Sequence, residues 1–138
     1  MKKKYLILFY LFLLTFDLNS VGFIDHVEIK SDKVEFSNKS KNVSFLSNVN
    51  INSNYVVISA SSAIYDNKKE LISISGDPSS IRSNKNDNNF NGEAEKIIFF
   101  SDEKVHLIGN ASIKFDNLSI RSNLIIFNPM SGKIMSSE

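Results

Sequence analysis

The chain of 138 residues contains no cysteine, only two prolines and only five glycines. Without cysteine no disulfide can form, so the fold must be held by strand pairing and burial of apolar side chains. The scarcity of proline and glycine argues against a loop-rich scaffold and fits long strands. Basic and acidic residues nearly cancel, at 16 and 15, and this balance does not predict a nucleic-acid-binding surface.

The sequence also lacks a set of residues that would form a catalytic or metal site. Its two histidines, His26 and His106, lie eighty residues apart. The sequence offers no obvious nucleophile beside either of them and no carboxylate placed to orient the imidazole. Glu93 and Glu95 share one face of an expected strand, where solvated charges are the simpler interpretation. Metal binding needs a tighter cluster of His, Asp or Cys side chains. We therefore expect a protein that is not an enzyme and that uses no metal or cofactor.

The N-terminal segment is typical of a secretory signal peptide. Lys2–Lys4 form a positive region, Tyr5–Phe16 is a twelve-residue run that is apolar except for one threonine, and Ser20–Gly22 supplies a small-x-small cleavage signal. Twelve apolar residues are too few to span a bilayer, which takes roughly 20. We expect residues 1–22 to be removed, with cleavage after Ser20 as an alternative, and residues 23–138 to form one domain.

The rest of the chain alternates apolar and polar residues with a period of two, as expected of strands with one buried face. Val105, Leu107, Ala111 and Ile113 alternate with residues that are mostly polar. Strands are predicted at Val27–Phe36 (broken near Ser31-Asp32), Val43–Ile51, Val56–Ala60, Ser62–Tyr65, Leu71–Ser75, Glu95–Phe100, Val105–Lys114, Leu118–Arg121 and Leu124–Phe127. The pattern predicts an all-β protein.

Short polar segments separate these strands. Turns are expected at Ser37–Asn42, Asp66–Lys69, Ser101–Lys104, Asp116-Asn117 and Asn128–Gly132, because Asn, Asp, Ser and Gly tolerate turn geometry. The longest polar stretch, Ser83–Asn91, is interpreted as a loop between two units.

An internal repeat relates the two halves of the chain. Ser47–Ile51 matches Gly109–Ile113 at an offset of sixty-two, and Ser31–Phe36 matches Ala94–Phe99 at sixty-three. We interpret the repeated Asn-Val and Asn-Ala positions as turns. The repeat predicts two units of about four strands each, folded back and stacked around a dry core or an apolar groove.

The ordered set of motifs resembles the OstA-like domain of the LptA/OstA family of periplasmic lipopolysaccharide-transport proteins. The matching elements are Ile29–Asp32, Asn48-Val49 with Ile51, Ile58–Ala60, Ala63–Tyr65, Gly76–Pro78, Gly92–Glu95 with Ile97 and Phe99, Leu107–Ala111, Ile120–Phe127 and Gly132–Ile134. The resemblance covers essentially all of residues 23–138. One departure is Ser47, which stands where the family usually has the glycine of Gly-Asn-Val.

The resemblance implies an open, twisted β-jelly roll of antiparallel V-shaped strands. It also implies a periplasmic protein that binds the acyl chains of lipopolysaccharide in its apolar interior. Such proteins stack end to end, as a possible homo-oligomer and with inner-membrane-anchored and outer-membrane Lpt components, to bridge the two membranes. No nucleic-acid partner is implied.

Two sets of residues are the candidate sites. The lipid-binding interior is expected at Val43, Phe45, Val49, Ile51, Ile58, Ile97, Phe99, Leu107, Ala111, Ile113, Ile120 and Phe127. Edge strands that would pair with partners are expected at Val27, Glu28, Ile29 and Lys30 and at Lys133, Ile134, Met135 and Ser136. From the pattern alone an ordinary β-sandwich core is the favoured interpretation of the apolar set, and the family resemblance reverses that preference.

Other interpretations stay open. Lys30, Lys33, Arg82 and Arg121 could meet lipid phosphates or could be solvated strand ends. The chain could instead be the membrane-anchored component of the same bridge (LptC-like), with Tyr5–Phe16 retained as an anchor. A structural exported β-repeat protein is a third possibility.

Overall fold

The computed structural model describes residues 26–85 and 89–137 of the chain; the predicted signal peptide lies outside these residues. Within them the chain forms nine β-strands in one sheet. Their bounds are β1 (Glu28–Lys30), β2 (Lys33–Phe36), β3 (Val43–Asn52), β4 (Val56–Asp66), β5 (Leu71–Ser83), β6 (Phe90–Phe100), β7 (Val105–Phe115), β8 (Leu118–Phe127) and β9 (Ile134–Ser137).

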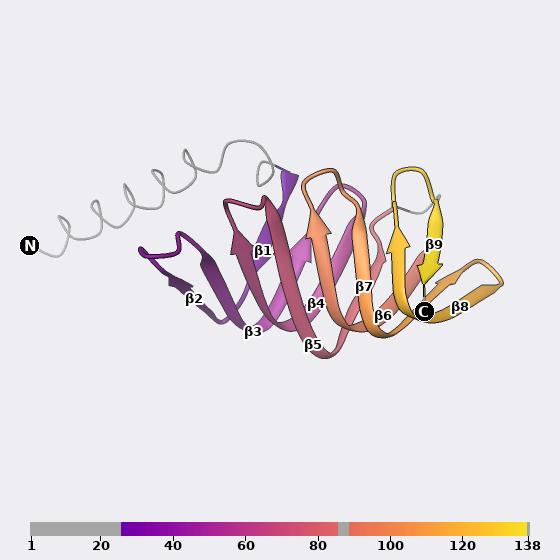
Figure 1. The fold of residues 1–138 in the computed structure, drawn as a ribbon, viewed down its shortest axis with the longest axis horizontal. Helices are drawn as coiled ribbons and strands as arrows, with labels where there is room; N and C mark the ends of the chain where they lie inside the picture. The colour runs from indigo at the N-terminus through magenta and orange to yellow at the C-terminus, as the bar shows by residue number, and fades with distance from the viewer. Residues whose placement is uncertain (1–25, 86–88, 138) are drawn as a thin grey trace, which may run out of the picture.

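The sheet is an antiparallel meander in which strands from β3 to β9 lie in sequence order (Figure 1). At its N-terminal edge, β1 pairs with the second half of β3 and β2 with the first half. At the other edge, β9 pairs with only one half of β8. The all-β architecture and the open, unclosed sheet agree with the fold predicted from the sequence.

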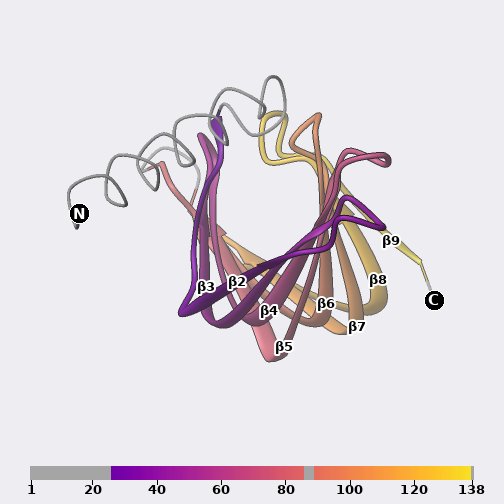
Figure 2. The ribbon, with the colours of Figure 1, turned by 90° about the vertical axis from the view of Figure 1, so that its left-hand side faces the viewer.

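Each long strand bends in the middle, so the sheet folds over on itself (Figure 2). Each pair of neighbouring strands in the series from β3 to β8 has a register shift at this point, for example between Ser59 and Ser62 in β4. A β-bulge produces a shift of this kind. We call the half that contains β2 and β9 the first arm, and the half that contains β1 the second arm. The bent strands are the V-shaped strands that the family resemblance implies.

The repeated dipeptides lie at the bends of β3 and β7. Ser47 and Asn48 have φ angles of 65° and 52°, and Gly109 and Asn110 have 83° and 45°. Two successive left-handed residues turn an extended strand sharply, and glycine and asparagine tolerate that conformation best. The repeated asparagines, which we interpreted as turns, therefore lie at bends inside the continuous strands β3 and β7.

The two asparagines also make equivalent hydrogen bonds. The Asn48 side chain donates to the Asp32 carboxylate over 2.7 Å, and the Asn110 side chain donates to the Glu95 carboxylate over 2.9 Å. Asp32 and Glu95 occupy matching positions in the sequence repeat. The repeat thus encodes the bend together with a polar contact that braces it.

The strand bounds show how the repeat is built. Strands β3, β4 and β5 of the first unit correspond to β7, β8 and β9 of the second. The single strand β6 corresponds to β1 and β2 together. The two four-strand units lie side by side in one sheet, so the expected stacking of separate units was wrong. The segments predicted as separate strands at 56–60 and 62–65, and at 118–121 and 124–127, are continuous through the bend as β4 and β8.

The core lies between the two arms, on the concave face of the sheet. In the second arm the register places Ile29, Ile51, Ile58, Ile81, Ile113 and Ile120 in one row across the strands. Small residues stand beside the bend, among them Ser79, Ala94 and Ala111, and these three are buried. Small side chains fit here because the concave side of the bend brings neighbouring strands' side chains together.

We predict that Ser47→Gly stabilises the protein by about 1 kcal/mol, since glycine adopts the left-handed conformation of Ser47 without a steric penalty. Ser44→Gly is the matched control, because Ser44 lies in the same strand in extended conformation; it should cost roughly 0.5–1 kcal/mol. Urea unfolding of both variants measures the difference. A Ser47→Gly variant that loses stability as Ser44→Gly does would contradict a left-handed bend at this position.

Candidate functional site

The structure places the predicted interior residues together on the concave face. Nine of the twelve belong to one buried cluster, and Phe45 and Ile120 are partly buried against it. Val43 is buried but lies outside that cluster. The residues in the cluster are Val49, Ile51, Ile58, Ile97, Phe99, Leu107, Ala111, Ile113 and Phe127.

Ten further core residues were not in the predicted interior set, although Val105 was expected on the apolar face of its strand and Val27 at a partner edge. They are Val27, Val56, Ala63, Ile72, Ile74, Ile81, Phe90, Ala94, Val105 and Ile125. Ile125 lies in a run that is apolar on both faces, so alternation does not say which face is buried. The pairing of Leu107 with Ile125 would have placed it, but that register is a property of the folded sheet.

The two arms contact each other through these side chains. Phe90 of the second arm packs edge-to-face on Phe127 of the first arm, with 4.5 Å between ring centroids. Surface hollows occur at the margins, for example beside Asn52 and Asn84, and their linings are mainly polar. Among the described residues the side chains of the two arms therefore pack against each other and form a core.

The ends of the sheet leave the concave face uncovered. Val34 and Phe36 in β2 pair with Phe45 and Val43 and so extend the apolar rows, yet they are 56% and 57% exposed. At the opposite end Leu118 is 57% exposed, on the half of β8 that β9 does not cover. Apolar surface of this kind at a sheet edge favours pairing with another protein.

The predicted partner-edge residues lie where the sheet ends. Glu28, Ile29 and Lys30 form β1, and Ile134, Met135 and Ser136 lie in β9; Val27 and Lys133 immediately precede these strands. Strand β2 and the second-arm half of β8 also form edges of the sheet, and the sequence did not predict them as edges. A break near Ser31-Asp32 was predicted, and it separates β1 from β2.

The cationic residues do not gather at one opening. Lys30 pairs with Glu28 at 3.4 Å and Lys33 pairs with Glu35 at 3.0 Å, and all four side chains are largely exposed. Such exposed ion pairs contribute little stability. Arg121 lies opposite Ser112, on the convex face of the second arm.

A hydrogen bond joins the tips of the two arms. We call the opening between these tips, on the side away from the bend, the mouth. The Ser53 hydroxyl, at the turn between β3 and β4, lies 3.3 Å from the Glu103 carboxylate, at the turn between β6 and β7. Ser53 is 5% exposed and Glu103 is half-buried. Burial raises the pKa of the Glu103 carboxyl, and the hydrogen bond from Ser53 and the nearby His26 partly offset that rise.

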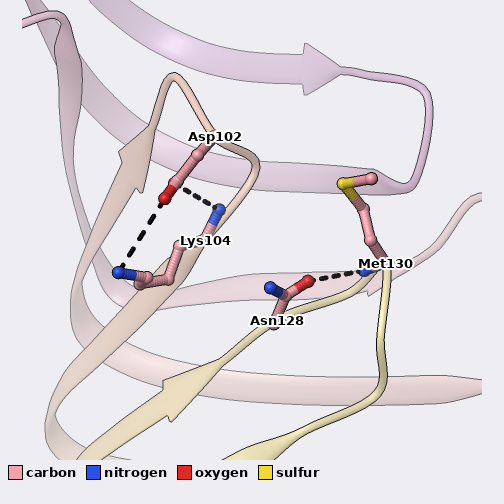
Figure 3. Close-up of polar contacts among 4 residues, drawn as sticks. All are labelled: Asp102, Lys104, Asn128 and Met130. Carbon is pink, nitrogen blue, oxygen red and sulfur yellow. Dashed lines mark hydrogen bonds and ion pairs between the residues drawn. The ribbon is translucent and has the colours of Figure 1, made fainter.

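The tip that carries Glu103 is held by local hydrogen bonds. The backbone amides of Glu103 and Phe100 donate to the carbonyls of Phe100 and Lys104, each over 3.0 Å. Asp102 accepts a hydrogen bond from the Lys104 amide and pairs with its ammonium group at 3.8 Å (Figure 3). The next tip of this arm has a similar turn, in which Asn128 accepts a hydrogen bond from the Met130 amide.

His106 lies on the convex face, as the alternation predicts. It is half-buried and not simply exposed, because its ring packs on Phe100 with 4.7 Å between centroids. This burial, with the nearby Lys104, lowers the pKa of the imidazole. Among the described residues no group of His, Asp and Glu could hold a metal ion.

We predict that Glu103→Gln changes the pH dependence of stability. Because the folded state raises the pKa of Glu103, the wild type loses stability as the pH rises through that value, whereas a glutamine does not ionise. The melting temperature of the variant minus that of the wild type should therefore increase from pH 4 to pH 7. A difference that decreases over this range would mean that the folded protein favours the ionised carboxylate.

We also predict that Phe127→Ala destabilises the protein by about 3–5 kcal/mol, because it removes a fully buried ring that joins the arms. Met135→Ala is the control: its side chain is 51% exposed, and the change should stay within about 0.5 kcal/mol. Denaturant unfolding measures both. Equal effects would contradict a core between the arms.

Comparison with known proteins agrees with this architecture. Residues 28–133 match the family described as LptA/(LptD N-terminal domain) LPS transport protein. The fold is similar to the crystal structure of LptH from Pseudomonas aeruginosa, the LptA-homologous periplasmic component of the lipopolysaccharide transport device, with a TM-score of 0.72 and 13% identity over 81% of this chain and 82% of that one. No curated protein matches the chain in sequence. The family match spans most of the chain and runs from β1 to the turn before β9, so the protein belongs to the family of LptA and LptD N-terminal-domain lipopolysaccharide transport proteins.

Proposed function

We propose that this protein acts without catalysis in the transport of lipopolysaccharide across the periplasm and holds the lipid's acyl chains between its two arms. The observation that carries the proposal is the apolar concave face, which runs unbroken from β2 to β8 and is uncovered at both ends. A barrel would close around such a surface, whereas this sheet stays open. Family membership supports the same role.

The energetics of this binding are those of the hydrophobic effect. Each acyl methylene that leaves water contributes roughly 0.8 kcal/mol, so a long chain is held without specific polar contacts. The interior side chains already pack against each other, and on binding they exchange contacts between the arms for contacts with lipid. The shape of the interior, and no single residue, then determines affinity.

The uncovered edges support assembly with neighbouring proteins. Strand β1 with β2 at one end, and β9 with the exposed half of β8 at the other, present backbone groups that a partner strand can pair with. Such pairing would continue the apolar face of one domain into that of the next. The partners we propose are the membrane-bound components of the Lpt bridge or a second copy of this chain.

An inner-membrane-anchored role for the same fold is the second candidate. The residues described here include no helix that is long and apolar enough to cross a membrane, and the segment Tyr5–Phe16 lies outside them. N-terminal sequencing of the protein purified from its native cells separates the two roles. A start near Phe23 supports the soluble carrier, and an intact Met1 supports the anchored component.

Photo-crosslinking in cells tests the lipid path. A photoreactive amino acid at Phe45 or Leu107, on the concave face, should capture lipopolysaccharide. The matched controls are Ser44 and His106, the preceding residue in each strand, which face the convex side because neighbouring strand residues alternate. Capture at all four positions, or at none, would contradict binding between the arms.

Depletion of the protein in its native organism tests the transport role itself. Lipopolysaccharide should then accumulate at the inner membrane, because its carrier between the membranes is missing. Normal delivery to the outer surface after depletion would overturn the proposal and leave a structural role for the fold.

A further inference from the structure

We propose that Ser53 and Glu103 form a clasp that closes the mouth between the arms, and that the clasp must open for an acyl chain to enter or leave sideways. This inference rests on the proposed function, since it concerns how that interior is reached. It requires that the contact joins opposite arms, that each side is held in place, and that side chains fill the space between the arms behind it.

The contact joins turns that are far apart in the sequence and on opposite arms. Ser53 follows the second-arm half of β3, and Glu103 follows the first-arm half of β6. The 3.3 Å between the Ser53 hydroxyl and the Glu103 carboxylate therefore spans the mouth and does not lie within one hairpin. Figure 1 shows the two turns at similar positions along the long axis of the sheet.

The Ser53 hydroxyl can donate one hydrogen bond, and its oxygen accepts hydrogen bonds from two backbone amides. Its oxygen accepts from the amides of Tyr55 and Val56, at 3.4 and 3.2 Å. Its proton is then available to the Glu103 carboxylate at 3.3 Å or to the Val56 carbonyl at 3.4 Å. A hydroxyl with two possible acceptors can release Glu103 without losing its own hydrogen bond, which is the behaviour that a reversible clasp requires.

Both sides of the clasp are anchored to their own arms. The Asn84 side chain donates to the Ser53 carbonyl over 2.7 Å and to the Asn52 side chain over 2.9 Å, so the end of β5 holds the second-arm tip. The Glu103 tip is held by the backbone bonds to Phe100 and Lys104 described above. Opening the mouth thus breaks the contact between two rigid tips and leaves each turn intact.

The packed interior makes such an opening necessary for entry from the side, between the arm tips. The ring of Phe90 on Phe127 and the fully buried Ile97 and Leu107 fill the space between the arms. A bulky head group cannot travel through this core, so it must stay outside while the acyl chain passes between the separated arms. The clasp joins the arm tips, which lie at the opposite end of the strands from the bend. When the arms separate by pivoting at the bend, the tips move farthest, so a contact there limits the separation most.

The absence of native cysteine allows a direct test. In the double variant S53C/E103C, a short bis-methanethiosulfonate reagent bridges the two tips, and dithiothreitol removes the bridge. Association of purified lipopolysaccharide should slow by about tenfold or more in the bridged protein, as expected when access is gated by a conformational step. Reduction should restore the rate of the unbridged variant.

The matched control is S80C/E93C. These two residues are direct partners on adjacent strands of the second arm, so bridging them strengthens the sheet without crossing the mouth. Association should be unchanged by this bridge, although either bridge can raise the melting temperature. Equal rates for bridged and reduced S53C/E103C would overturn the clasp, and so would equal slowing by both bridges.

A second variant, and a measurement made without lipid, test the clasp independently of the proposed function. Glu103→Ala removes the acceptor and leaves the turn hydrogen bonds of Ser53 in place; it should speed lipid association. Without lipid, hydrogen exchange at the amides of the core strands should slow when the S53C/E103C bridge forms. Unchanged exchange overturns the clasp, whereas slowed exchange together with no lipopolysaccharide binding by the wild type supports the clasp and overturns the proposed function.

Discussion

The sharp bend in the middle of each long strand determines how this sheet buries its apolar face. A flat sheet with one apolar face would leave that face in water, and burying it normally takes a second sheet or a layer of helices. Here Ser47-Asn48 and Gly109-Asn110 turn their strands, and the register shifts carry the bend across the neighbouring strands. One sheet thereby supplies both layers of its own core, and each long strand contributes to both.

The same bend explains why the sheet has an interior and also has edges. Closure into a barrel would remove the edges, whereas a folded sheet buries its concave face and still ends at β1 and β2 on one side and at β8 and β9 on the other. The rows of apolar side chains continue to the ends of the sheet, where side chains such as Phe36 and Leu118 are exposed. An interior that continues to uncovered ends suits a carrier that works in series with others.

The sequence predicted the strands more reliably than their connections through the bend. Alternation located β3 and β7 nearly to the residue, and the Asn, Asp and Ser clusters located the turns of the first arm. It divided β4 and β8 because a bulge shifts the alternation by a residue and resembles a chain break. It also left Ile125 unassigned, since its neighbours Leu124 and Ile126 are equally apolar. The contact between Ser53 and Glu103 had no signal in the sequence, because the two residues are related only by how far the arms fold over.

The all-β class, the four-strand repeat, part of the inward-facing apolar set and the family resemblance could all be predicted from the sequence alone. These depend on local periodicity and on residues that tolerate particular backbone angles, which are written along the chain. The folded structure was needed to show that the two repeats share one sheet and that β2 and half of β8 are also free edges of it. It was also needed to show that side chains fill the space between the arms and that a polar contact joins the arm tips. These features depend on strand register and on the angle of the bend, which arise when residues far apart in the sequence meet.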